Sequence, residues 1–370
     1  MGIPYLVGAG LIVGFTLVYI VLGGMRGVAW SDCLQGILML LCMIIAFILI
    51  AHRLGGFVKV NLELYRNNEM LFMRPGKGGS LLPLIWFSYM SLWFLCDPMF
   101  PQLFQRFQAA KGEYAIKISA ILYPLVTGLL FFLPVALGVM GNKVFPNLAP
   151  KEADKILPML ADKLLPSWLV AVIFTGGLAA LMSTLDSQLL TLASIFQCDI
   201  YEVLTGRKSS PILSKFFVTI LCLIALLLAF KPPATMLAIL TQAFTGLAVL
   251  FPITFGLIYY NRLNSRVAVF AIIIGELLVG LSYFKLLPTF GFLPVIPITV
   301  VVTLVLFIGS ILKPEQRKTY GIKLPMKFIW ILVFLLAHDY FWWKKPPVFI
   351  LGLPHWMWYF VSLNLLLIIL

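Results

Sequence analysis

Residues 174–201 read FTGGLAALMSTLDSQLLTLASIFQCDIY, an apolar stretch interrupted at regular steps by small and hydroxyl-bearing residues. It continues the apolar run 167–190, which is long enough to cross a bilayer as a helix, since about 20 residues are needed. The small and hydroxyl residues recur at steps of three and four and therefore share one helix face. They are Gly177, Ala180, Ser183, Thr184, Ser187, Thr191 and Ser194.

Two interpretations of this face remain open. Small residues allow membrane helices to pack closely, so the face is typical of a helix–helix contact. The same face also fits a cation site, because sodium is a hard ion that prefers oxygen ligands. The hydroxyls of Ser183 and Thr184, with the carbonyl of Ala180, offer three such oxygens.

Comparable apolar runs fill the rest of the chain. Of its 370 residues 62% are hydrophobic and 11% are charged, whereas soluble domains carry about 25% charged residues. The runs predict about eleven transmembrane helices, near residues 3–24, 29–51, 80–104, 115–140, 167–190, 211–230, 235–260, 266–285, 290–312, 326–341 and 346–370. We therefore expect an all-α polytopic membrane helix bundle, a single transmembrane domain over residues 1–370 that crosses the cell membrane several times.

The chain has a formal net charge of +13, and its basic residues lie in loops between these runs. This charge is better explained by membrane topology and anionic lipid headgroups than by nucleic acid binding. The loops that contain Arg106, Arg207, Arg262 and Arg317 are predicted to be cytoplasmic. The five cysteines form no CxxC pair, and the three histidines have no metal-ligand spacing. Without a His/Asp or Ser/His constellation, we expect neither an enzyme nor an organic cofactor.

Charged residues inside the predicted spans are costly, so each is a candidate functional residue. Asp32 opens the second span, where a helix N-cap is the alternative role, and Asp186 lies in the fifth span. Glu276 lies in the eighth span, where a structural or interfacial role is favoured. Asp97 with Pro98 in the third span predicts a helix broken at membrane depth, beside a buried site or a water cavity. A simple kink is the alternative.

Four segments, in this order, resemble segments of one transporter family. They are GGMRGVAWSDCLQG at 23–36, PQLFQRFQAAK at 101–111, LAALMSTLDSQLL at 178–190 with DIY at 199–201, and TQAFTGLA at 241–248. Together they resemble the sodium:solute symporter family, which includes proline, pantothenate and glucose cotransporters. The resemblance spans nearly the whole chain.

The resemblance implies a leucine-transporter-type fold of two inverted five-helix repeats. It also implies sodium-coupled symport of a small organic solute by alternating access. Sodium is then the coupling ion, and the partners are sodium, the solute and the lipid bilayer. The alternative is a non-transporting membrane sensor or partner subunit derived from a symporter.

The resemblance further implies roles for individual residues. Ala180, Ser183 and Thr184 match half of the family's sodium site, and Asp32, Asp186 and Ser187 form a second candidate cation site. Gln242 matches a glutamine that contacts sugar in one branch, although a helix–helix hydrogen bond is an equal alternative. Trp93 and Asp97 are further candidate solute contacts, while Phe100 stands where the family has a polar residue.

Aligned with the family, the chain begins at what should be the fourth core helix. It is therefore expected to be N-terminally truncated and to lack the first core helix, which supplies the other half of the sodium site. On this basis we expect the chain alone not to perform sodium-coupled transport.

Overall fold

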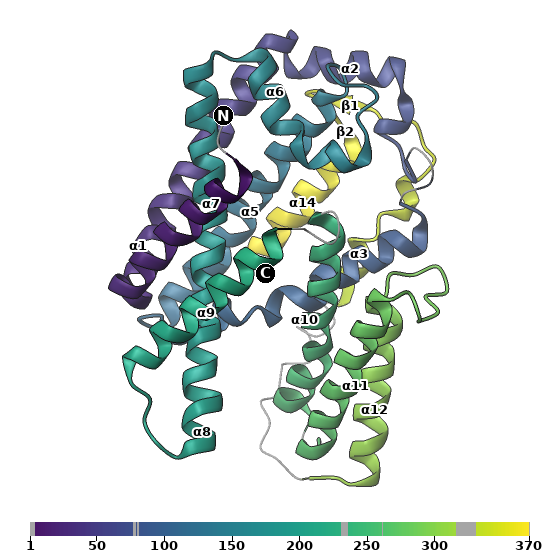
Figure 1. Cartoon of the computed structure of the whole chain (residues 1–370). Helices are drawn as coiled ribbons and strands as arrows, with labels where there is room; N and C mark the ends of the chain where they lie inside the picture. Colours follow the sequence, from purple (N-terminus) through teal and green to yellow (C-terminus); the bar gives the residue numbers. More distant parts are fainter. Residues whose placement is uncertain are drawn as a thin grey trace. The chain divides into compact units, whose positions relative to one another are not determined.

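The computed structural model describes residues 4–76, 79, 81–230, 236–260, 262–315 and 331–369. These residues are helical almost throughout, as Figure 1 shows, which confirms the all-α class. In the described parts, strands occur only as the two-residue antiparallel pair β1 (Phe349–Ile350) and β2 (Leu353–Pro354). The chain forms two compact units, which we describe separately. The first contains Met1–Asn61 and Gln105–Thr235, and the second contains Leu62–Phe104 and Met236–Leu370.

Within the described residues, the first unit contains four long apolar helices and two short helices of nine and four residues. They are α1 (Tyr5–Leu54), α5 (Glu113–Gly141), α6 (Ile156–Leu164), α7 (Ser167–Ile195), α8 (Glu202–Thr205) and α9 (Pro211–Ala229). Two shorter helices, α2 (Phe57–Asn67) and α4 (Pro101–Ala109), each cross a boundary between the units.

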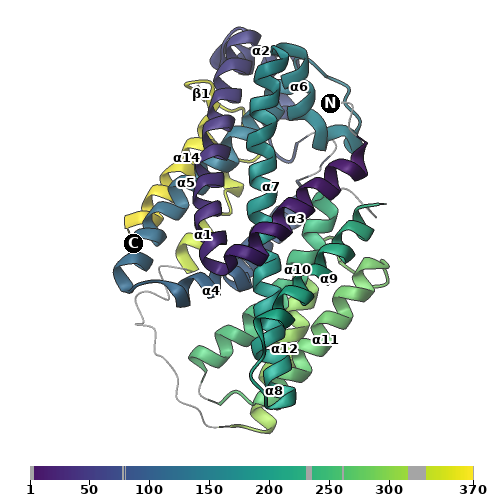
Figure 2. The ribbon, with the colours of Figure 1, turned by 60° about the vertical axis from the view of Figure 1, so that its left-hand side comes forward.

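Helix α1 covers the first two predicted spans. Its backbone leaves the helical region at Gly24, with φ 54° and ψ −152°, a conformation that glycine adopts without a steric penalty. Figure 2 shows the two arms of α1 running in different directions from this point. The bend at Gly24 therefore separates the first two predicted spans, near residues 3–24 and 29–51.

Helix α7 packs along α1. The predicted face is buried only in part, with Ser187 and Thr191 buried. Gly176 and Ala179 are buried, whereas Gly177 and Thr184 are exposed. A Cβ atom at Gly176 would overlap Cys42 of α1, so the two helices approach closely there. Farther along, α1, α7 and α9 share an apolar core of Ile20, Val28, Leu189, Ala193, Val218 and Cys222.

The second unit contains α3 (Pro83–Cys96), α10 (Met236–Tyr259), α11 (Ser265–Tyr283), α12 (Val295–Leu312) and α14 (His355–Ile369). Helices α10, α11 and α12 lie side by side in Figure 1 and pack around a buried core that includes Val249, Ala271 and Val302. Gly275 of α11 permits this packing, because a Cβ atom there would overlap Val249 and Val302.

Among the described residues, seven helices are long and apolar enough to cross a membrane, so the protein is a multi-pass membrane protein. Helix α1 accounts for two of the predicted spans. Residues 331–342 and α14 are shorter apolar helices, and residues 326–330 of the predicted span 326–341 lie outside the described residues. The predicted span 80–104 is interrupted, because the 3₁₀ turn η3 (Asp97–Met99) separates α3 from α4. The total of about eleven transmembrane helices stays a prediction.

Candidate functional site

Two carboxylates from different helices of the first unit meet in one hydrogen-bonded cluster. Asp32 lies on α1, just after its bend, and Asp186 lies on α7, where it is fully buried. The Ser187 hydroxyl joins them, since its Oγ is 3.1 Å from Asp32 Oδ2 and 3.3 Å from Asp186 Oδ1. The structure thus brings together the three residues predicted to form a second cation site.

Asp32 is paired with a cation. The guanidinium of Arg106, on α4, forms a salt bridge with Asp32 Oδ2 and donates a 2.6 Å hydrogen bond to Ser187 Oγ. The Ser183 hydroxyl donates to the other oxygen of the Asp32 carboxylate. Both oxygens of Asp32 are therefore engaged by groups from other helices.

Asp186 receives hydrogen bonds from neutral groups. Tyr19 donates its phenol proton to Asp186 Oδ2 at 2.6 Å, and the Ser31 hydroxyl is 3.4 Å from the same oxygen. Tyr19 precedes the bend at Gly24 and Ser31 follows it, so both arms of α1 reach this carboxylate. Among the described residues, no basic side chain pairs with Asp186. With both carboxylates ionised and Arg106 charged, the cluster carries a net charge of −1.

A cavity of about 590 Å³ adjoins this cluster. It is lined by Met25, Arg26, Ala29, Asp32, Arg106 and Ala109. The Asp32 side chain is 14% exposed and that of Arg106 is 44% exposed, so the salt bridge lies at the boundary between the cavity and the helix contact. Asp32 and Arg106 thus line this cavity together.

The other candidate sodium ligands are divided between two environments. The Thr184 hydroxyl donates to the Ala180 carbonyl at 3.1 Å on the exposed side of α7. The Ser183 hydroxyl instead donates to Asp32, so Ser183 belongs to the carboxylate cluster as well as to the predicted half-site with Ala180 and Thr184. The assignment of Ala180, Ser183 and Thr184 to a sodium half-site stays a prediction. Among the described residues, no group of three or more His, Cys, Asp or Glu side chains has a metal-binding arrangement.

The predicted solute contacts lie in the second unit. The Gln242 amide of α10 donates to the Val279 carbonyl at 2.6 Å, and its nitrogen is 3.1 Å from Ser282 Oγ. Both partners belong to α11, which is the geometry of the helix–helix alternative. A solute contact at Gln242 stays a prediction.

The break after α3 carries the remaining two candidates. Trp93 is 41% exposed and packs edge-on against Phe244, with ring centroids 5.1 Å apart. The ring of Phe100 also packs against Phe244, with a centroid distance of 5.3 Å. Asp97 is half-buried at the start of η3, and the described residues provide no ion-pair partner for it. The solute roles of Trp93 and Asp97 also stay predictions.

Sequence reasoning missed several members of the cluster. Tyr19, Ser31 and Arg106 were not proposed as site residues, although Arg106 lies in one of the family-like segments. Gln105, beside Arg106, accepts a 3.1 Å hydrogen bond from Thr191 of α7 and so fixes α4 against that helix. Spacing alone gave no signal for these contacts, which join residues 74 to 167 positions apart.

A model of the family described as "Sodium:solute symporter family" matches residues 1–275 of the chain. The chain belongs to the sodium:solute symporter family. This confirms the resemblance that the four segments indicated.

Its relatives include transporters of two named solutes. The sodium/pantothenate symporter of Escherichia coli (strain K12) is 27% identical over 84% of this chain and 65% of its own length. The sodium/proline symporter of Salmonella typhimurium (strain LT2) is 25% identical over 75% of this chain and 58% of its own length. The chain thus spans less than two thirds of the length of these relatives.

A solved structure shares the fold. A Na⁺-coupled sialic acid symporter in a substrate-bound outward-open state matches 86% of this chain and 69% of its own chain, with a TM-score of 0.65 and 21% identity. This likeness confirms a leucine-transporter-like helical fold.

Proposed function

We propose that the chain acts in sodium-coupled symport of a small organic solute, with the Asp32–Asp186 cluster as a sodium site. The observation that carries this proposal is the convergence of two carboxylates and two serine hydroxyls, with a single cationic side chain paired to Asp32. The net charge of −1 favours a bound monovalent cation, and the oxygen-rich composition suits sodium. The adjoining cavity supplies its route of entry.

Sodium at this position would couple to helix arrangement. The proposed ligands come from α7 and from the arm of α1 that follows Gly24, and Tyr19 on the other arm holds Asp186 by a hydrogen bond. An ion bound among these ligands would therefore stabilise one arrangement of the two helices over others. A ligand shifts a conformational equilibrium by its difference in affinity for the two states. A membrane potential adds about 2.3 kcal/mol per charge per 100 mV to inward sodium movement.

Arg106 would compete with sodium for Asp32. Its guanidinium now lies where an entering ion would need the Asp32 carboxylate. Sodium entry therefore requires Arg106 to share or release Asp32, while Asp186 and Ser187 contribute oxygens. Ser183 belongs to both candidate ion sites and would link their occupancy.

Sodium-specific thermal stabilisation tests the site without knowledge of the solute. Purified chain in detergent is heated in sodium chloride and in choline chloride of equal ionic strength. We expect the melting temperature to rise with sodium, because a ligand that binds only the folded state stabilises it. Asp186→Asn should abolish the rise, whereas Asp162→Asn, an exposed control, should keep it. No sodium-specific rise in the unmodified chain, or an unchanged rise in Asp186→Asn, would reject the site.

Uptake measurements then separate transport from ion binding alone. Labelled proline and pantothenate, the solutes named for the relatives, are offered to proteoliposomes with and without an inward sodium gradient. Gradient-dependent uptake supports symport by the chain itself. Sodium binding without uptake of either solute agrees with the expectation that the chain alone does not transport, or with a sensor or partner subunit.

A further inference from the structure

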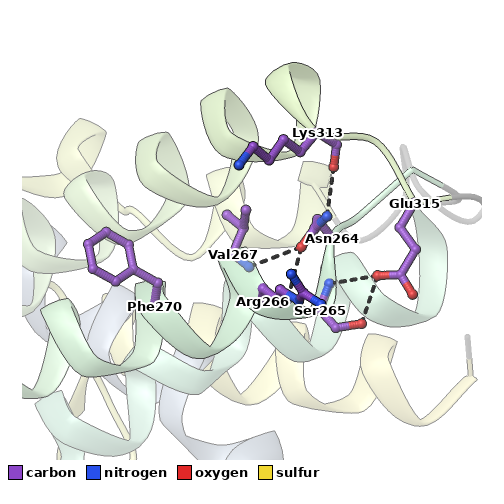
Figure 3. Close-up of a pocket in the computed structure, with 7 residues that line it drawn as sticks. All are labelled: Asn264, Ser265, Arg266, Val267, Phe270, Lys313 and Glu315. Atoms are coloured by element: carbon purple, nitrogen blue, oxygen red, sulfur yellow. Dashed lines mark hydrogen bonds between the residues drawn. The ribbon is translucent and has the colours of Figure 1, made fainter.

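A second pocket lies in the second unit, where α11 begins and α12 ends. Its volume is about 510 Å³, and Figure 3 shows the residues that line it: Asn264, Ser265, Arg266, Val267, Phe270, Lys313 and Glu315. This pocket shares no residue with the Asp32–Asp186 cluster. It has no part in the function proposed above.

The backbone N–H groups at the start of α11 already have hydrogen-bond acceptors within the chain. Asn264 Oδ1 accepts hydrogen bonds from the backbone N–H groups of Arg266 and Val267, at 2.9 and 3.2 Å. Glu315 Oε2 accepts from the Ser265 backbone N–H and hydroxyl, at 2.9 and 2.8 Å. Any ligand of the pocket must therefore bind to side chains rather than to the N–H groups of the first turn.

Two cations remain without a counter-charge. Among the described residues, neither Arg266 nor Lys313 forms an ion pair, and the Glu315 carboxylate is directed to Ser265. In Figure 3 the Lys313 side chain extends toward the side of Val267 and Phe270, away from Glu315. The lining has a formal charge of +1, and arginine and lysine side chains bind phosphate by charge-assisted hydrogen bonds.

An exposed apolar surface continues from the pocket along both helices. On α11 the exposed fractions of Phe270, Ile273 and Leu277 are 58%, 52% and 63%, and their spacing places them on one face. On α12, Phe307 and Ile311 are 54% and 55% exposed. Both helices are long enough to span a membrane, so these faces suit acyl chains. A free phosphate would use the cations but none of this apolar surface.

We propose that this pocket binds the headgroup of an anionic phospholipid whose acyl chains lie along α11 and α12. The topology predicted from loop charge agrees, because it places Arg266 and Lys313 on the cytoplasmic side, where anionic lipids attract basic residues. The occupant is a bilayer lipid, and it acts as a structural ligand of the α11–α12 pair.

Lipid-dependent stability of the purified full chain tests this assignment. Mixed micelles contain phosphatidylglycerol, phosphatidylcholine or neither, and soluble glycerol 3-phosphate is added in a separate series. Phosphatidylglycerol should raise the melting temperature at a mole fraction about tenfold lower than the mole fraction of phosphatidylcholine that gives the same rise. Glycerol 3-phosphate should have no effect. Equal stabilisation by the two lipids would overturn the proposal, and so would stabilisation by glycerol 3-phosphate, which would indicate a small-anion site.

Charge-matched variants locate the effect. Arg266→Gln with Lys313→Gln should remove the preference for phosphatidylglycerol, whereas Arg266→Lys with Lys313→Arg should retain it. Arg207→Gln with Lys208→Gln removes two exposed cations from a loop of the first unit and should leave the preference intact. If this control loses the preference as well, the effect is one of overall charge and the pocket assignment is wrong. Circular dichroism of each variant verifies that its helices form.

Discussion

The phenol of Tyr19 donates a 2.6 Å hydrogen bond to the fully buried carboxylate of Asp186, which joins α1 to α7 across 167 residues of sequence. The donor lies on the arm of α1 that precedes Gly24, while Asp32 lies on the arm that follows it. The bend therefore brings both arms to one section of α7. The candidate ion site depends on the angle between these arms as much as on its ligands.

Replacing Tyr19 tests how strongly this contact holds the helices. Tyr19→Phe removes the donor to a carboxylate and leaves the ring, so the free energy of unfolding should fall by about 1.5–3 kcal/mol. Thermal denaturation in detergent measures the change. Tyr114→Phe, at a position that is 77% exposed on α5, is the control and should have little effect. Equal melting temperatures for the two variants would contradict a stabilising role for the Tyr19–Asp186 hydrogen bond.

Arg106 offers a test of competition for Asp32. Arg106→Gln removes the positive charge from the cluster, so the sodium concentration for half-maximal stabilisation should fall by about tenfold, equivalent to about 1.4 kcal/mol. Arg106→Lys should keep an affinity close to that of the unmodified chain. Arg26→Gln removes a cation from the wall of the same cavity and should cause a much smaller change. Weaker sodium binding in Arg106→Gln would show that Arg106 organises the site instead of competing for it.

Adjacent glycines on α7 distinguish its packed face from its exposed face. A methyl group at Gly176 would overlap Cys42, whereas nothing lies within 4 Å of a Cβ atom at Gly177. Gly176→Ala should therefore destabilise the fold by about 1–3 kcal/mol through overpacking. Gly177→Ala should be neutral or slightly stabilising, because alanine favours the helix. Chemical denaturation of both variants provides the comparison, and a reversed order would place the wrong face of α7 against α1.

The sequence predicted some of this architecture because certain features are local. The boundary between the first two predicted spans falls at the bend at Gly24, and the predicted break at Asp97-Pro98 is present, since both depend on local backbone preferences. The buried face of α7 was predicted only in part, since small residues at adjacent positions define faces about 100° apart. Only the packing against Cys42 distinguishes Gly176 from Gly177.

The ion cluster was predictable only in part. Buried carboxylates are costly in a membrane span, and this cost identified Asp32 and Asp186 as site candidates. Their partners Tyr19 and Arg106 are ordinary residues by local criteria. Their roles follow from helix packing over long sequence separations, which spacing does not encode.

Labelling tests the predicted orientation of the chain. A single cysteine at Lys208→Cys, in a background where the exposed Cys33 and Cys198 are replaced by serine, reports the location of the loop after α8. The contrast in basic residues between the shorter loops, together with the family resemblance, predicts that this loop is cytoplasmic. A membrane-impermeant maleimide should label it in permeabilised cells and leave it unlabelled in intact cells. Ready labelling in intact cells would reverse the topology.

The buried pair Arg74–Asp339 gives a stability prediction for the second unit. The two side chains are 7% and 1% exposed, and the Arg74 guanidinium lies 4.3 Å from the ring centres of both Trp86 and Trp356. Burial lowers the pKa of Arg74 from its ordinary value, and the charge of Asp339 opposes that shift. Arginine nevertheless remains charged at all ordinary pH values, so the pair stays ionised and ties the segment before α3 to residues near the C-terminus.

Removal of one partner should cost more than removal of both. Arg74→Met leaves Asp339 buried without a counter-charge, so the free energy of unfolding should fall by about 3–5 kcal/mol. Adding Asp339→Asn to that variant removes the isolated charge and should recover much of the loss, although the stacking on the two tryptophans stays lost. Arg66→Met, at an exposed position on α2, is the control and should change the melting temperature little. If the double variant is less stable than Arg74→Met, the loss comes from the aromatic contacts and hydrogen bonds of the two side chains, and the unpaired charge is not its cause.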